Sequence, residues 1–408
     1  MAAKVALIYT DKYQAYNFGP QHPLRPLRLK LTHSLMEKLG LLNSENLEII
    51  EPRIATKEEI ERIHATEYVN VVSKLSQNPD DPIINGDNTL FKGAYIYGLG
   101  PGDNPIFRGM YEASALVCGA SIAAADLVWK DNEFQISFNP AGGMHHAIKD
   151  RASGFCIFND IAVAIAHLKT LKKEIKVAYL DIDCHHGDGV QWLFYDDPNV
   201  LKISFHESGR FLFPGTGNID EIGEGLGKGY SINFPLLPGT NNKMFLKLFR
   251  YSVPRLLEAY NPDILFTQLG VDTHFNDPLT QMGLSISVYR DIAQTMRSCA
   301  RDYCQNRWVA VGGGGYLMSV VPRAWSLFLA KMLDIELKNE LPSDWIKEVK
   351  QIVPYEETPY RLWDQNDKAE IQLLSHPEIA KKMIDYNNEL KTILNEKFLP
   401  NLERSVKI

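Results

Sequence analysis

Residues 177–189 read VAYLDIDCHHGDG, and this stretch decides how the rest of the chain is interpreted. It begins with a β-rich apolar run, 177–181, and passes directly into a polar, glycine-containing loop. In parallel sheets such runs form buried strands, and ligands bind just beyond the carboxyl ends of those strands. Asp181, Asp183 and His185 recur at every second position, so a persisting strand would turn them to one face.

The same alternation of strands and helices continues along the chain. Strands are predicted at 5–9, 135–138, 177–181, 200–205, 264–269 and 308–311, and helices at 112–130, 160–173, 243–260, 288–305 and 320–333. This rhythm predicts a three-layer α/β/α fold with a mostly parallel sheet. The charged stretch 342–408 is expected to be a helical C-terminal extension, so that 1–408 forms a single domain.

Four of the predicted strands end in polar or glycine-rich loops. These loops contain the sequences NPAGGMHH, DIDCHHGDG, LGVDTHFND and GGGGY. Because the carboxyl ends of parallel strands share one edge of a sheet, we expect the four loops to meet there.

The composition excludes several classes of protein. Hydrophobic residues make up 45% of the 408 residues, which is enough for a substantial core, and the formal net charge of -7 argues against nucleic-acid or anionic-membrane binding. The five cysteines are scattered and form no CxxC pair. No signal peptide or membrane span is expected, and a cytoplasmic location follows.

A metal site is the first chemical prediction. Asp183 and His185 offer one oxygen and one nitrogen ligand, and Asp272, which follows the predicted strand 264–269, is the best-placed third ligand. Three protein ligands and an open position are typical of catalytic zinc. Two carboxylates make the site harder than most zinc sites, so iron(II), cobalt or manganese remain alternatives.

Acid–base groups are predicted beside this metal. His145 and His146 follow a flexible Ala-Gly-Gly turn, and Asp181 and Asp188 are the carboxylates available to orient their rings. Tyr316 follows four consecutive glycines, 312–315, whose spacing does not fit a phosphate-binding GxGxxG loop. The glycines let the backbone approach a ligand closely, and the tyrosine hydroxyl could then stabilise an oxyanion.

Taken together, the motifs NPAGGMHHAIKDRASGFCIFNDIAVAI, YLDIDCHHGDGVQWLFY, FPGTGNIDEIGEG and GGGGY resemble the class I-type histone deacetylases. The likeness is greater to their bacterial and archaeal relatives, the acetoin-utilisation (AcuC-type) deacetylases, and it covers roughly 4–325. The resemblance implies an arginase/deacetylase-like fold and zinc-dependent hydrolysis of N-ε-acetyl-lysine in proteins or peptides by a metal-activated water. It assigns the zinc ligands to Asp183, His185 and Asp272, the general acid–base to His146 with Asp188, the second histidine–acid pair to His145 with Asp181, and carbonyl polarisation to Tyr316.

The resemblance also implies a tunnel for the acyl-lysine side chain, an exit channel and two cation sites. The tunnel would run between Phe155 and Phe213, with Gly154 and Leu279 at its wall, Asp103 gripping the substrate backbone and Arg28 lining an acetate channel. Structural K⁺ or Na⁺ ions are expected at two sites, one with Asp181, Asp183, His185, Ser204 and Phe205, the other with Phe194, Asp197, Val200 and Tyr230.

Alternatives remain open at this point. Acetylated polyamines or other small acylated amines could be the substrates, although polyamine-selective relatives carry an acidic residue where Leu279 stands here. A non-catalytic scaffold and an arginase-like dinuclear hydrolase are further alternatives. His274 and Phe275 replace smaller residues and are expected to crowd the rim of the site. Structural roles are expected for Cys156, Cys184, His22, His33, His64, His167, His186, His206 and His376.

Overall fold

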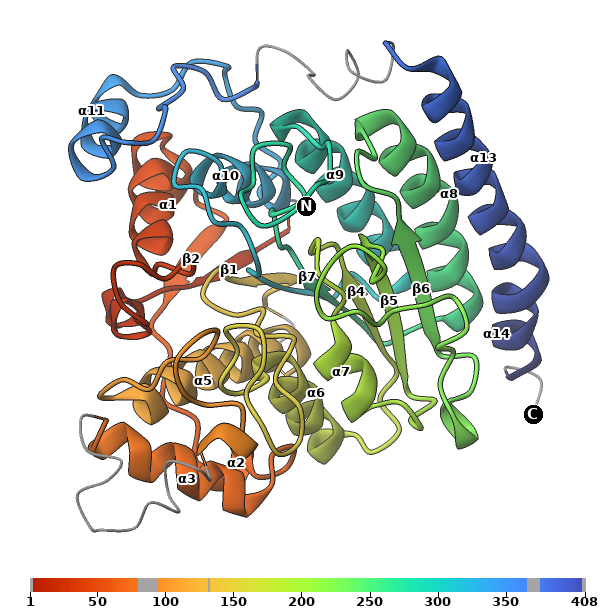
Figure 1. Cartoon of the computed structure of the whole chain (residues 1–408), viewed down its shortest axis with the longest axis horizontal. Coiled ribbons are helices and arrows are strands. Elements are labelled where there is room, and N and C mark those ends of the chain that lie inside the picture. The colour runs from red at the N-terminus through yellow and green to blue at the C-terminus, as the bar shows by residue number, and fades with distance from the viewer. Residues whose placement is uncertain (1–2, 80–93, 131–132, 365–374, 406–408) are drawn as a thin grey trace.

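The computed structural model describes residues 3–79, 94–130, 133–364 and 375–405, and a single eight-stranded sheet lies at its centre (Figure 1). The strand order is β2-β1-β3-β8-β7-β4-β5-β6, and every neighbouring pair is parallel. The strands are β1 Val5–Ile8, β2 Leu47–Ile50, β3 Ile136–Asn139, β4 Val177–Asp181, β5 Val200–Glu207, β6 Ser231–Leu236, β7 Ile264–Gln268 and β8 Trp308–Val311. The predicted parallel sheet is therefore confirmed.

Helices cover both faces of the sheet, which confirms the three-layer prediction. Helices α5 and α6 pack together on one face, whereas α1, α10, α9 and α8 form a continuous layer on the other (Figure 1). The α-helices are α1 Leu27–Lys38, α2 Lys57–Ile60, α3 Thr66–Gln77, α5 Met110–Trp129, α6 Asp160–Leu171, α7 Asp188–Leu193, α8 Asn242–Tyr260, α9 Ile286–Tyr303, α10 Val321–Met332, α11 Ser343–Ile352, α13 Pro377–Ile393 and α14 Leu399–Ser405. All five predicted helices are present, with ends that differ by no more than two residues.

The two edge strands were not predicted, and their environment explains why. Strand β2 has only four residues, none of them fully buried, so it lacks a continuous apolar signal. Strand β6 contains Pro235, which argues against a central strand because proline cannot donate to a ladder hydrogen bond. Proline is tolerated on an edge strand, and β6 lies at the edge of this sheet.

The four strands that precede the polar loops are neighbours in the sheet, in the order β3-β8-β7-β4. Their last residues are also in register, with Asn139 opposite Val311, Val311 opposite Gln268, and Gln268 opposite Asp181. All four loops therefore leave the sheet side by side. The predicted meeting of these loops is confirmed, and it fixes the position of the site.

The C-terminal region contains helices α11, α13 and α14, whereas 353–364 are not helical, and the parts of the predicted extension at 365–374 and 406–408 lie outside the described residues. Helices α13 and α14 pack along α8, and Trp345 of α11 donates from Nε1 to the carbonyl oxygen of Leu31 in α1 at 3.0 Å. The assignment of this region to the same domain stays a prediction. Helix α5 is long and apolar enough to cross a membrane, but 72% of the relevant segment is buried in the fold, as in a core helix.

Candidate active site

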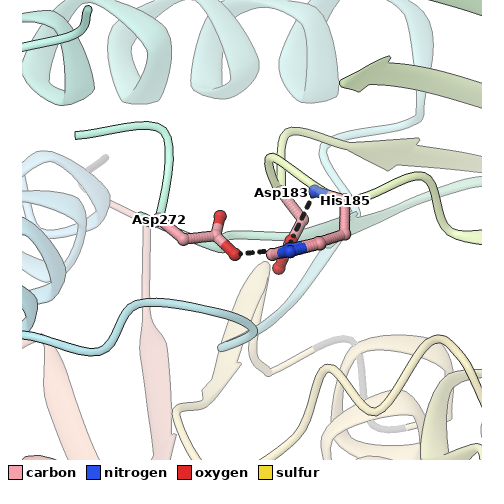
Figure 2. Close-up of side chains that lie close together, drawn as sticks. All are labelled: Asp183, His185 and Asp272. Carbon is pink, nitrogen blue, oxygen red and sulfur yellow. Dashed lines mark hydrogen bonds and ion pairs between the residues drawn. The ribbon is translucent and has the colours of Figure 1, made fainter. Parts of the chain in front are cut away.

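Three potential metal ligands converge where β4 and β7 end (Figure 2). Asp183 and His185 follow β4, Asp272 follows β7, and their ligand atoms all lie within 4.8 Å of one another. His185 Nδ1 is 2.9 Å from Asp272 Oδ2 and 3.2 Å from Asp183 Oδ1, and all three residues are buried. Two carboxylates and one imidazole suit a divalent ion such as zinc and leave a coordination position free.

Backbone and side-chain donors fix the two carboxylates in place. Asp183 Oδ2 accepts hydrogen bonds from the Gly314 amide at 2.7 Å and from Gln268 Nε2 at 2.6 Å. Asp272 Oδ1 accepts one from the amide of Cys184 at 2.7 Å. A Cβ atom on Gly314 would lie 2.1 Å from Asp272 Oδ2, so only glycine allows this approach. The glycine-rich loop therefore approaches the metal ligands themselves.

The charges of the cluster also favour a cation. Burial and the neighbouring Asp183 carboxylate raise the pKa of Asp272 to about 6. Burial opposes protonation of His185, but Asp183 and Asp272 outweigh it and raise the pKa of this histidine to about 10. Two carboxylates thus share a dry site with one imidazole between them. A bound divalent ion would neutralise their repulsion and release the proton from His185.

Two histidine–aspartate pairs lie beside this cluster. His146 Nδ1 is 2.6 Å from Asp188 Oδ1, and His145 Nδ1 is 2.8 Å from Asp181 Oδ2. The rings of His146 and His185 are 6.0 Å apart between centroids. All four predicted acid–base residues are therefore brought together, with the partners that were expected.

The two histidines differ in their proton affinity. Burial would lower the pKa of His145, but the charges of Asp181 and Asp183 raise it to about 9. Burial and the positive charge of His145 lower the pKa of His146 to about 4, against the pull of Asp188. His146 is thus neutral at pH 7 and is able to accept a proton, whereas His145 carries one.

The start of α6 holds the histidine loop, a role that the sequence did not reveal. Asp160 is fully buried, and its carboxylate accepts hydrogen bonds from the amides of Gly143 and Met144 and from the hydroxyl of Ser121. Asn159 Nδ2 donates to the carbonyl of His145 at 3.3 Å and to that of Ala147 at 3.0 Å. The only available signal was Asn159 as the N-cap of a helix.

Two phenylalanine rings flank the site, and the tunnel between them stays a prediction. Phe155 packs edge-on against Tyr316 with centroids 5.8 Å apart, and Phe213 packs edge-on against His146 at 5.1 Å. Gly154 has a φ of +49°, and a Cβ atom there would lie 2.4 Å from His146 Cδ2 and 3.0 Å from Phe213 Cε1. Glycine at this position lets the wall of the site touch the acid–base histidine.

The residues predicted at the entrance lie close by. Asp103 and Gly154 line one pocket of about 300 Å³, and the Asp103 side chain is exposed to solvent. His22 lies 3.2 Å from the Asp103 carbonyl oxygen through Nε2 and packs edge-on against Phe155 at 4.5 Å. His22 was expected to be purely structural, yet it supports the wall of the site. The Leu279 side chain is half-buried, and its place at the tunnel wall stays a prediction.

Arg28 lies behind the site and is almost fully buried. Its Nη1 donates to the carbonyl oxygens of Gly313 at 2.7 Å and Gly315 at 3.0 Å, and it lines a small cavity of about 20 Å³ with Tyr13, Tyr16 and Met144. Arg28 therefore supports the loop that carries Tyr316 and faces an internal space, where the acetate channel was predicted.

Asp277 is a buried acid that the sequence reasoning missed. Its carboxylate accepts hydrogen bonds from the amides of Tyr316 and Leu279, each at 3.0 Å. Burial and the charge of Asp272 raise its pKa to about 8. Asp277 connects the metal-ligand loop to Tyr316, and the only signal was its place within LGVDTHFND.

The expectation that His274 crowds the rim is wrong. His274 is 1% exposed, and its Nε2 lies 3.0 Å from Oδ2 of Asp364. Arg323, also buried, donates from Nη1 to the other oxygen of Asp364 at 2.9 Å. His274 thus ties the metal-ligand loop to the C-terminal region, because a buried histidine needs a polar partner. Phe275 stacks on His274 and is half-buried.

The remaining histidines and cysteines have the structural surroundings that were expected. All five cysteines are free and buried, and burial raises the pKa of Cys184 well above its ordinary value, so no thiolate nucleophile is indicated. His186 bonds to Thr216 and Gln191, and His206 lies 2.8 Å from the Ser204 hydroxyl. His33 stacks on Tyr9, His64 and His167 are hydrogen-bonded and buried, and His376 is exposed.

The residues predicted for two monovalent cations fall into two separate groups. Asp181, Asp183 and His185 lie at the end of β4, next to Ser204 and Phe205 of β5, since Asp181 pairs with Ser204 in the sheet. Phe194 and Asp197 lie between α7 and β5, Val200 begins β5, and Tyr230 precedes β6. The second group is already engaged by lysine side chains.

Comparisons with known proteins agree with this geometry. A family model described as the histone deacetylase domain matches residues 22–332. The acetoin utilization protein AcuC of Bacillus subtilis (strain 168) is 41% identical over 340 residues, which cover 83% of this chain and 84% of that protein. AcuC of Staphylococcus aureus (strain MSSA476) is 38% identical over 351 residues, 86% of this chain and 87% of that protein. A crystal structure of an HDAC homolog complexed with SAHA matches with a TM-score of 0.78 and 30% identity, covering 96% of this chain and all of that one. The chain therefore belongs to the histone deacetylase family of hydrolases.

Proposed function

We propose that this protein hydrolyses the acetyl group from N-ε-acetyl-lysine in proteins or peptides. The observation that carries the proposal is the juxtaposition of the Asp183–His185–Asp272 cluster with the neutral His146. Tyr316 and the two phenylalanine rings adjoin the same space. Acetyl-lysine has a long, mostly apolar side chain with an amide at its end. A pocket with aromatic walls and polar groups at its base suits such a substrate.

Asp183, His185 and Asp272 would hold the metal, with zinc as the proposed ion and Fe²⁺ or Co²⁺ as alternatives. When bound, such an ion supplies a Lewis acid for the acetyl carbonyl and lowers the pKa of water to about 7. Backbone amide donors hold the carboxylates of Asp183 and Asp272 in position. The donor set is thus preorganised by the fold, which favours tight binding.

The proton transfers are assigned to His146. Its Nε2 is the unprotonated ring nitrogen and can accept a proton from the attacking water, because Nδ1 donates its own proton to the carboxylate of Asp188. The same nitrogen then returns the proton to the leaving amine, so acetate and the lysine side chain are the products. The Tyr316 hydroxyl would donate a hydrogen bond to the carbonyl oxygen as negative charge develops on it. Burial raises the pKa of Tyr316 well above its ordinary value, which keeps the hydroxyl proton in place.

A site with one metal ion is favoured over a dinuclear one. Within the described ranges, Asp183, His185 and Asp272 form the only group of three possible ligands with this spacing. An arginase-like dinuclear centre would need further bridging carboxylates. The acidic residues nearest the cluster, Asp181 and Asp277, are occupied by His145 and by backbone amides. The scaffold alternative is disfavoured because every polar group that the reaction needs is present.

Protein-bound lysine is favoured over polyamines by the absence of an acidic side chain at position 279. The experiment compares kcat/KM for an acetyl-lysine peptide and for an acetylated polyamine, with wild-type protein and with Leu279→Glu. We expect the wild type to prefer the peptide and L279E to move the ratio towards the cationic polyamine. A polyamine preference in the wild type would contradict the proposed substrate.

The setting proposed for this reaction is the cytoplasm, with acetylated proteins or peptides as partners in the role of substrates. The five free cysteines agree with a reducing compartment. The net charge of -7 suits lysine-rich segments of a substrate and disfavours direct nucleic-acid binding.

A further inference from the structure

The second predicted cation site, formed by Phe194, Asp197, Val200 and Tyr230, contains an unexpected side chain. Lys202, in β5, is 3% exposed, and its Nζ donates a hydrogen bond to the carbonyl oxygen of Phe194 at 2.5 Å. Lysine is among the residue types that are least often fully buried, and it needs a specific reason to be so. Here the buried amino group has a specific partner, the carbonyl oxygen of Phe194, which belongs to the predicted cation site.

Two further residues of this site are engaged as well. The carboxylate of Asp197 forms an ion pair with the Nζ of Lys169 and accepts a hydrogen bond from the amide of Asn199 at 2.9 Å. The Lys202 amide donates to the carbonyl of Tyr230 at 2.9 Å. Three of the four predicted ligands are therefore bonded to donors that the protein itself supplies.

A monovalent cation fits poorly beside these lysines. An ammonium group carries the same charge as K⁺ and makes the same kind of contact with carbonyl oxygens, so one can replace the other. A metal ion at the Phe194 carbonyl would have to displace the Lys202 amino group and leave it buried without a partner, which is costly. It would also be repelled by the ammonium group of Lys169.

The first predicted cation site differs from the second in the partners of its oxygen atoms. Among the described hydrogen bonds and ion pairs, none joins a lysine or arginine to Asp181, Asp183 or Ser204. Their partners are backbone amides, a tyrosine, a glutamine and histidines. This site keeps its acidic character, so the two sites are not equivalent.

We propose that the amino group of Lys202 occupies the second cation position, so that the Phe194–Tyr230 site of this chain binds no K⁺ or Na⁺. Burial lowers the pKa of Lys202 to about 7, against the carboxylates of Asp197 and Asp196. The amino group donates to the Phe194 carbonyl in both protonation states, so the position is filled in either case. Any response of the protein to K⁺ then arises at the first site.

The experiment uses the full-length, metal-loaded protein and Rb⁺ as a probe that replaces K⁺ and scatters anomalously. Crystals of wild type, Lys202→Ala and Lys202→Met are equilibrated in RbCl. Lys172→Ala serves as the control, because it removes a lysine whose side chain is exposed and pairs with Asp263 instead of the Phe194 carbonyl. We expect no Rb⁺ peak beside the Phe194 carbonyl in wild type, K172A or K202M, and a peak there in K202A, where the space is vacated.

A Rb⁺ peak beside Phe194 in the wild type would overturn the proposal, whatever is found at the first site. The absence of a Rb⁺ peak beside the Phe194 carbonyl in folded K202A would also overturn the proposal. Thermal unfolding in KCl against choline chloride at equal ionic strength gives a second measurement. K202A is expected to show a larger K⁺-dependent rise in Tm than wild type and K172A, because only K202A binds K⁺ at the second site in addition to the first. If folded K202A is obtained only when KCl is present, the proposal is supported. A K⁺-dependent rise in Tm of equal size in all variants would contradict it.

Discussion

The Nε2 atoms of His145 and His146 face each other at 3.1 Å, while the Nδ1 atom of each ring is bonded to a separate aspartate. Two protonated rings in this arrangement would repel each other across a dry space. The proton therefore resides on His145, whose pKa is raised to about 9, and His146 is left neutral with a pKa of about 4. This asymmetry assigns different roles to two adjacent residues of the same type.

Replacement of His146 tests the assigned acid–base role. We expect His146→Ala to lower kcat by roughly 10²- to 10⁴-fold, the usual contribution of general acid–base catalysis, with the metal content unchanged. Asp188→Asn should cause a smaller loss, because the ring remains but its orienting carboxylate is gone. Steady-state kinetics on an acetyl-lysine peptide and metal analysis check both points. A kcat for H146A within a factor of three of wild type would remove His146 from the reaction.

The hydroxyl of Tyr316 is tested by Tyr316→Phe, which removes one oxygen and retains the ring that packs against Phe155. Loss of one oxyanion donor typically costs about 10²- to 10³-fold in kcat. We expect that loss with little change in KM, since the interaction forms mainly in the transition state. An effect confined to KM would instead place the hydroxyl in ground-state binding.

Gly154 has a positive φ and no room for a side chain, and these two effects can be separated. Gly154→Ala would place a Cβ atom 2.4 Å from His146 Cδ2, whereas a Cβ atom on Gly225, which has a similar φ of +51°, would meet no atom within 4 Å. Both variants carry backbone strain of roughly 1–2 kcal/mol. Only G154A should also lose activity, by at least tenfold, because it displaces the histidine ring. Equal activities in G154A and G225A would contradict this contact.

The fold and the main chemical groups were predictable because their signals are local and repeated. The strand 177–181 and the loop after it indicated both the sheet and two metal ligands, and Asp272 lies in the loop that follows strand β7. The supporting residues were less visible. Asp160, Asp277 and Gln268 act through contacts with loops distant in the sequence, and their local patterns resemble ordinary caps and strand ends. Lys202 lies within a predicted strand, and its burial could not be inferred from that position.

The burial of His64 leads us to expect that the free energy of unfolding depends on pH, independently of the metal site. Its Nδ1 lies 2.9 Å from the carbonyl of Ile148, its Nε2 accepts a hydrogen bond from the amide of Asn159, and burial lowers its pKa to about 4 from 6.5. Between pH 6.5 and pH 4 the unfolded chain therefore binds a proton at His64 that the folded chain does not. Stability from this residue is full above pH 6.5 and falls by about 3 kcal/mol as the pH drops to 4.

Urea unfolding at pH 7.5 and pH 5 measures this effect. His64→Gln should lower stability at pH 7.5 but show a smaller loss between the two pH values than wild type. His376→Gln, at an exposed position, is the control and should retain the wild-type slope. A pH slope in H64Q equal to that of wild type would show that His64 does not titrate differently in the folded state.

The most direct test of the proposed chemistry is acetate release from an acetyl-lysine peptide by the protein as purified, after chelation, and after reloading with Zn²⁺, Fe²⁺ or Co²⁺. Asp272→Asn is measured in parallel for activity and metal content. The account predicts activity that chelation abolishes and one equivalent of metal restores, with D272N binding metal weakly and remaining inactive. Acetate release that persists in fully metal-free protein would contradict it, as would a fully metal-loaded wild type that releases no acetate.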